Sequence, residues 1–146
     1  MKKSVLTVLF ALLVSAASAT AAELPAALLD PYLRVQDALA RDQTDTVKQD
    51  AAAVAKAAAA IGPQAKPVAD AALELERAGS LDAARDAFAK VSEAVLAYAK
   101  ASGSNPPPDV KVAFCAMNAK PWLQKGNTVR NPYYGSQMLE CGEFKK

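Results

Sequence analysis

The chain has 146 residues, with 17 basic side chains, 15 acidic side chains, no histidine and two cysteines. The formal charge of +2 excludes the strongly basic composition of nucleic-acid-binding domains. The sequence also lacks histidine, a glycine-rich phosphate loop and a nucleophile elbow, so we expect no enzyme and no catalytic residues.

The N-terminal segment has the pattern of a secretory signal peptide. Lys2 and Lys3 precede an apolar run that ends near residue 15, and small residues follow it. The run is shorter than the roughly 20 residues that a membrane-spanning helix needs. We therefore expect residues 1–22 to be removed by cleavage near residues 19–22. The product would be a soluble periplasmic protein with no membrane insertion and with 15 basic and 15 acidic residues, because the leader carries two lysines and no acid.

Residues 23–103 are rich in alanine and are expected to form a helical bundle. Asp30 and Pro31 have the pattern of an N-cap followed by proline at the first helical position. The fourth segment has an apolar residue on every turn of one face, while Asp82, Arg85 and Asp86 are expected on its solvated face. The four expected helices cover residues 30–41, about 45–61, 64 or 67 to 78, and 81 to about 101.

Short connections between these segments favour antiparallel neighbours, so the expected fold class is all-α, an up-and-down four-helix bundle. A run of serine, glycine, asparagine and proline at residues 102–108 cannot continue the last helix. We treat residues 104–146 as an irregular tail of the same domain, packed on the bundle. Its residues 110–114 alternate weakly and are compatible with a short strand or hairpin, and turns are expected at residues 125–128 and 131–135.

The tail contains four sulfur-bearing residues that can converge. Cys115 and Met117 would share one face of an extended strand, and Met138 and Cys141 are separated by about one helical turn. Thiolates and thioethers prefer Cu(I) to hard cations, and Ag(I) binds similar ligands. The pattern therefore favours a soft-metal site formed by Cys115, Met117, Met138 and Cys141.

The same two cysteines also fit a disulfide, and the sequence leaves this alternative open. Exported proteins with an even, small number of cysteines most often oxidise them. A bond between Cys115 and Cys141 would stabilise the fold by roughly 3–4 kcal/mol in the chain-entropy model. The protein would then be a non-metal interaction module that docks through its bundle or its tail. Trp122, Tyr133 and Tyr134 could line such a surface, although packing against the bundle is the more common role of such aromatics.

Several tail motifs resemble those of a known family. They are Phe114-Cys115-Ala116-Met117, Trp122-Leu123-Gln124-Lys125, Arg130-Asn131-Pro132-Tyr133-Tyr134-Gly135 and Met138-Leu139-Glu140-Cys141-Gly142. Together they resemble a periplasmic helical domain family of unknown function, found alone or at the C-terminus of copper and silver efflux adaptor subunits. Ala116 stands where that family has proline. The resemblance implies a periplasmic location, heavy-metal handling and an efflux component as partner.

Overall fold

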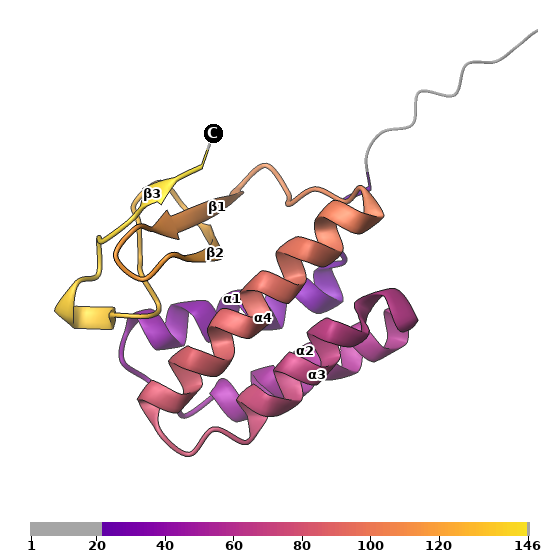
Figure 1. Ribbon diagram of the computed structural model, residues 1–146, viewed down its shortest axis with the longest axis horizontal. Helices are drawn as coiled ribbons and strands as arrows, with labels where there is room; N and C mark the ends of the chain where they lie inside the picture. The colour runs from indigo at the N-terminus through magenta and orange to yellow at the C-terminus, as the bar shows by residue number, and fades with distance from the viewer. Residues whose placement is uncertain (1–21, 146) are drawn as a thin grey trace, which may run out of the picture.

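The structure is a computed structural model that describes residues 22–145. The predicted signal peptide, except for Ala22, lies outside the described residues. Four helices are followed by a small three-stranded antiparallel sheet (Figure 1). Within the described part of the chain, no helix is both long enough and apolar enough to cross a membrane. The expected helical bundle is confirmed, and the strand or hairpin that the sequence allowed in the tail is present as part of a three-stranded sheet, which an all-α class does not include.

The bounds of the helices are close to those predicted, with one exception. The first helix begins at Ala26 and contains Pro31 in its interior, so Asp30 is not its N-cap. Leu28 and Leu29 are almost fully buried, and this burial outweighs the backbone hydrogen bond that Pro31 cannot donate. The helices are α1 (Ala26–Ala40), α2 (Val47–Ile61), α3 (Lys66–Glu76) and α4 (Leu81–Ser102), with short 3-10 turns η1 (Pro63–Ala65) and η2 (Gly135–Gln137).

The fourth helix begins and ends at the residues that the sequence indicates. The Ser80 hydroxyl accepts a hydrogen bond from the backbone N–H of Ala83, as an N-cap does. Gly103 ends the helix in the left-handed conformation, with φ of 67°. Consecutive helices pack against one another, and Figure 1 shows α4 between the sheet and the α2–α3 pair.

The sheet has the strand order β2-β1-β3, and its central strand carries one of the two cysteines. Strand β1 (Val110–Cys115) pairs antiparallel with β2 (Lys120–Lys125), and it pairs on its other side with the short strand β3 (Glu143–Phe144). Strand β2 packs on α1 and α4. The helices therefore cover one edge of the sheet, and the C-terminal segment returns to the other edge.

A line of aromatic rings joins the sheet to the helices. The ring of Tyr32 in α1 lies 5.0 Å from that of Phe88 in α4, measured between centroids. Phe88 is followed by Tyr133 at 6.1 Å, and Tyr133 meets the edge of Trp122 at 5.7 Å. All four side chains are buried. The aromatic residues Trp122 and Tyr133 thus hold the tail on the bundle, which is the more common role of aromatic side chains in such a segment.

Two tyrosine hydroxyls satisfy the outer backbone edge of β2. The Tyr32 hydroxyl accepts a hydrogen bond from the backbone N–H of Leu123 at 3.0 Å and lies 2.7 Å from the Ser92 hydroxyl. The Tyr133 hydroxyl donates to the backbone carbonyl of Pro121 at 2.6 Å. Burial raises the pKa of both tyrosines far above the ordinary value, so the hydroxyls stay protonated. The Leu123 N–H and the Pro121 carbonyl on the outer edge of β2 are therefore paired with side chains, so they are not available to pair with a further strand.

We predict that Tyr32→Phe lowers the free energy of unfolding by about 1–3 kcal/mol, because a buried backbone N–H loses its acceptor. Urea denaturation followed by circular dichroism measures this change. Tyr98→Phe is the matched control, because the structure gives the Tyr98 hydroxyl no protein partner among the described residues, and its cost should stay within about 0.5 kcal/mol. Equal losses in the two variants would contradict the role assigned to the Tyr32 hydroxyl.

Candidate functional site

The two cysteine sulfurs meet beside the end of strand β1. Cys115 is the last residue of that strand and is fully buried, whereas Cys141 lies in the loop before β3 and is half-buried. Their Sγ atoms are 3.0 Å apart, which is longer than a disulfide bond of about 2.05 Å. Both cysteines are free thiols here. The structure therefore brings the predicted pair together without the predicted covalent bond.

A glycine and the pairing of β3 carry Cys141 to this position. Phe114 pairs with Glu143, so the residues before β3 must pass close to the end of β1. Gly142 has φ of 143°, and a Cβ at this position would lie 2.9 Å from the Trp122 ring and 3.0 Å from the Phe114 carbonyl oxygen. Only glycine fits this approach without displacement of its neighbours. The position of Cys141 therefore depends on the residue that follows it.

Asn131 ties the segment before η2 to Cys141, a role that its place in the sequence did not indicate. Its side-chain amide donates a hydrogen bond to the Cys141 carbonyl at 2.7 Å, and its side-chain oxygen accepts one from the backbone N–H of Tyr133 at 2.8 Å. The Asn131 side chain also makes a small contribution to lowering the pKa of the Cys115 thiol. The Asn-Pro-Tyr-Tyr-Gly motif was the sequence feature that could have pointed to Asn131, but from the sequence it predicted only a turn.

The two methionines lie between the two cysteines in the chain and differ in exposure. Met138 is half-buried, and its carbonyl accepts a hydrogen bond from the backbone N–H of Cys141 at 3.0 Å, so one tight turn joins them as predicted. Met117 lies in the β1–β2 turn and is 69 % exposed. The expectation that Cys115 and Met117 share one face of a strand is wrong, because the strand ends at Cys115 and the turn follows at once.

The surroundings of the two thiols differ in their effect on ionisation. Burial raises the pKa of Cys115, but hydrogen bonds from Cys141 and from the backbone N–H groups of Asn118 and Met117 outweigh it, so its pKa falls below the ordinary value. The pKa of Cys141 is raised, mainly because it donates a hydrogen bond to Cys115, and also by burial and by the negative charge of that neighbour. The first thiolate of the pair therefore forms at Cys115.

We predict that the two thiols titrate in separate steps, one below and one above the ordinary cysteine pKa of about 8.5. Ultraviolet absorbance of the thiolates, recorded against pH on reduced protein, measures both steps. Cys141→Ala should raise the pKa of Cys115 by removing a donor, and Cys115→Ala should lower the pKa of Cys141 by removing the acceptor. Single-cysteine variants that keep the wild-type pKa values would contradict this coupling.

The predicted aromatic residues lie mainly inside the fold. Trp122 is fully buried and Tyr133 is 7 % exposed, while Tyr134 is half-buried. The Trp122 indole N–H donates to the Gln124 side-chain oxygen at 3.0 Å. Trp122 and Tyr133 are therefore packing residues and do not form an exposed surface for a partner.

One expected surface residue is buried. Arg85 in α4 is only 8 % exposed, because the tail covers this part of the helix. Its guanidinium forms an ion pair with Asp42 and donates to the carbonyls of Leu39 and Pro132 at 3.1 and 3.0 Å. The pKa of Asp42 is lowered, mainly by a hydrogen bond with Ser136 and next by the hydrogen bond from Arg85. The helix periodicity alone could not predict this, since the tail that buries Arg85 is distant in sequence.

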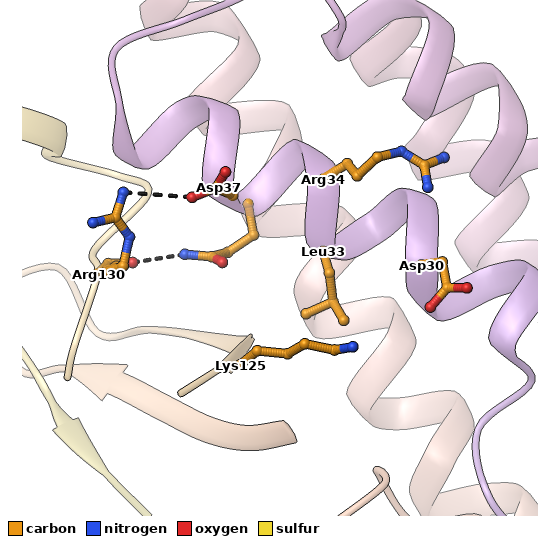
Figure 2. A pocket seen from close by; sticks show the side chains of 7 residues that line it. Asp30, Leu33, Arg34, Asp37, Lys125 and Arg130 are labelled. Carbon is orange, nitrogen blue, oxygen red and sulfur yellow. Dashed lines mark hydrogen bonds and ion pairs between the residues drawn. The ribbon is translucent and has the colours of Figure 1, made fainter. Parts of the chain in front are cut away.

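A charged cleft lies between α1 and the tail, apart from the cysteines (Figure 2). Its volume is about 520 Å³. Figure 2 shows Arg130 beside Asp37, where the ion-pair distance is 3.4 Å, and the Gln36 amide donates to the Arg130 carbonyl at 2.7 Å. The cleft is lined by Asp30, Leu33, Arg34, Gln36, Asp37, Lys125 and Arg130.

Comparison with known proteins gives one match. The profile of a family described as "Protein of unknown function (DUF3347)" matches residues 28–106. No curated protein and no solved structure matches the chain. The matched region contains α2, α3, α4, all of α1 except its first two residues, and the start of the linker, so Cys115 and Cys141 lie beyond it.

Proposed function

We propose a function from the chemistry of the cysteine site, since the chain belongs to the DUF3347 family and that family is of unknown function. The protein binds a soft monovalent metal ion, Cu(I) or Ag(I), in the periplasm. The thiolates of Cys115 and Cys141 are the main ligands, and the thioethers of Met138 and Met117 complete the site. The observation that carries the proposal is the 3.0 Å approach of two free thiols from distant positions in the chain.

The available donors fit a soft ion better than a hard one. Sulfur ligands select Cu(I), whereas Mg²⁺ and Ca²⁺ prefer oxygen ligands. Structural zinc sites usually have four thiolate or imidazole ligands. The chain has no histidine, and the described residues contain no group of three or more His, Cys, Asp or Glu side chains that could hold an ion. Two cysteines and two methionines are therefore the donor set that remains.

The geometry of the pair requires only a small opening to admit an ion. Metal–thiolate bonds are about 2.3 Å long, so two sulfurs that share one ion lie roughly 4 Å apart or more. The present separation is 3.0 Å, and Cys115 is fixed on the central strand. Cys141 is the ligand that moves, because it is half-buried in a loop. The site is thus close to a binding geometry before the ion arrives.

The lowered pKa of Cys115 favours binding near neutral pH. Metal ligands of this type must be deprotonated, so a thiol with a low pKa loses less binding energy to proton release. Cys141, with its raised pKa, then releases its proton when the ion binds. We expect the affinity for Cu(I) to rise with pH for this reason.

The methionines have different proposed roles. Met138 lies one tight turn before Cys141 and is half-buried like it, so we propose its thioether as the third ligand. Met117 is exposed in the turn after Cys115 and is proposed to contact the ion first, as it arrives from solvent or from a partner. Thioethers are neutral, so they add affinity for a soft ion without adding charge.

The predicted signal peptide and the resemblance of the tail to efflux-associated domains support a role in metal handling outside the cytoplasm. We propose that the protein receives or buffers Cu(I) or Ag(I) and transfers it to an efflux component. It performs no catalysis in this account. The protein then acts by ligand exchange between sulfur sites.

The test is competition for Cu(I) between the reduced protein and a chromogenic chelator, performed without oxygen. The wild type should take up one equivalent. Cys115→Ser and Cys141→Ser should each weaken binding by more than about 100-fold, since even the loss of groups that only orient ligands costs 10–100-fold. Met138→Leu should have a smaller effect. Leu139→Met is the matched control, because it adds a thioether beside the site and leaves the proposed ligands intact. Wild-type affinity in both cysteine variants would contradict the proposal.

A second candidate function is favoured by the charged cleft. Both signs of charge line it, and Lys125 and Arg130 come from the tail while the other lining residues come from α1. In this alternative the protein is an interaction module that binds a partner at the cleft (Figure 2). Arg130→Glu would then abolish partner binding and leave Cu(I) affinity unchanged, whereas the cysteine variants would do the reverse.

A further inference from the structure

We propose that the same cysteine pair is a thiol-exchange site, at which a small-molecule disulfide reacts first with Cys141 and Cys115 then closes an intramolecular disulfide. The consequence is that oxidation switches metal binding off, and this consequence rests on the proposed function. Two observations carry the proposal: unequal access to the two sulfurs and their short separation.

Access determines which cysteine reacts first. Cys115 is fully buried at the end of the central strand, so a bulky disulfide cannot reach its sulfur. Cys141 is half-buried, and its neighbours Glu140 and Gly142 are both exposed. An incoming disulfide therefore meets Cys141, although the Cys141 thiol is the weaker acid of the pair.

The first step is attack of the Cys141 thiolate on one sulfur of the disulfide R–S–S–R. The S–S bond of the reagent breaks, a Cys141–S–S–R bond forms, and one RS⁻ leaves. The proton of Cys141 passes to solvent. At this stage Cys141 is joined to one R–S group in a mixed disulfide, and Cys115 is still reduced.

In the second step the Cys115 thiolate attacks the Sγ atom of Cys141. The bond between Cys141 and the R–S group breaks, the second RS⁻ leaves, and a Cys115–Cys141 bond forms. Overall two protein thiols are oxidised and one external disulfide is reduced to two thiols, because the two protons lost by the protein thiols are taken up by the two RS⁻ leaving groups. The 3.0 Å separation places the two sulfurs within reach before reaction.

The product would join the end of β1 to the loop before β3. These segments are already adjacent through the pairing of Phe114 with Glu143, so the bond forms without rearrangement of the sheet. It consumes both proposed thiolate ligands. The oxidised protein therefore has the same fold and no soft-metal site, and a reductant restores the site.

The test uses the metal-free, reduced mature chain with oxidised glutathione, acid quenching and mass spectrometry. The wild type should form the internal disulfide with only a transient glutathione adduct. Cys115→Ser should accumulate the adduct on Cys141, and Cys141→Ser should react roughly tenfold or more slowly because its remaining thiol is buried. Near-ultraviolet circular dichroism verifies that both variants are folded. Equal rates in the two variants, or a wild type that ends with glutathione on both cysteines, would overturn the reaction order.

A second arm measures Cu(I) uptake before oxidation, after oxidation and after reduction. Loss of uptake on oxidation and its return on reduction are the expected results. Equal uptake by the oxidised and reduced forms would overturn the switch. If the reduced protein binds no copper, the proposed function fails, while the adducts of the first arm still determine whether the exchange occurs as described. The failure of one inference is thus distinguishable from the failure of the other.

Discussion

Trp122→Ala is expected to lower the free energy of unfolding by about 3–5 kcal/mol, the usual cost of removing a large aromatic side chain from a core. Trp122 is fully buried and meets the Tyr133 ring edge-on, with centroids 5.7 Å apart. Its indole N–H donates to Gln124, which is itself buried and would lose a partner. The variant therefore creates a cavity and removes one of the two hydrogen bonds that the Gln124 side-chain oxygen accepts, the other coming from the backbone N–H of Arg130.

The same change should disturb the cysteine pair, because the Trp122 ring lies against Gly142. We therefore expect Trp122→Ala to lower the midpoint of unfolding in urea and also to weaken Cu(I) binding. Leu73→Ala is the control for loss of apolar surface, since Leu73 is 37 % exposed and its replacement should cost about 0.5 kcal/mol or less. A loss below about 1 kcal/mol for Trp122→Ala would contradict the assigned role of the ring.

Gly135→Ala is the second large effect, with an expected loss of about 3 kcal/mol or more. Gly135 has φ of 53°, and a Cβ there would overlap Asp42 Oδ1 and Arg85 Nη2. Arg85 is buried, so separation of this ion pair leaves a charge without its partner inside the protein. The tail would then lose a fixed connection to α4 and to the end of α1.

Gly103→Ala separates the effect of backbone strain from the effect of disrupting the Asp42–Arg85 ion pair. Gly103 has φ of 67°, close to that of Gly135, but a Cβ at this position would meet nothing within 4 Å. The control should therefore cost only the backbone strain, about 1–2 kcal/mol. Thermal or urea unfolding of both variants gives the comparison. Equal losses would show that the Asp42–Arg85 pair adds nothing at Gly135.

The helices could be predicted because their signals are local. Ser80 caps α4, and Gly62 and Gly103 follow the ends of α2 and α4, so each boundary is determined by residues beside it. The start of α1 was mispredicted for a tertiary reason. Leu28 and Leu29 are buried against the rest of the fold, and this burial extends the helix through a proline that local rules place at its first turn.

The tail was less predictable, because its contacts join residues that are distant in sequence. Strand β3 has two residues, and it exists through its pairing with a strand about thirty positions earlier. The burial of Arg85 likewise depends on Pro132 and on the segment after it. The approach of Cys115 to Cys141 could be anticipated from the two turns between them, whereas the exposed position of Met117 could not.

X-ray absorption at the copper edge of the Cu(I)-loaded, reduced protein shows whether sulfur atoms of this chain hold the ion. We expect copper to be surrounded by sulfur at Cu–S distances of about 2.3 Å, and we expect this coordination to be lost in the Cys115→Ser, Cys141→Ser double variant. Copper surrounded by oxygen or nitrogen, or sulfur coordination that persists without both cysteines, would refute the proposed site.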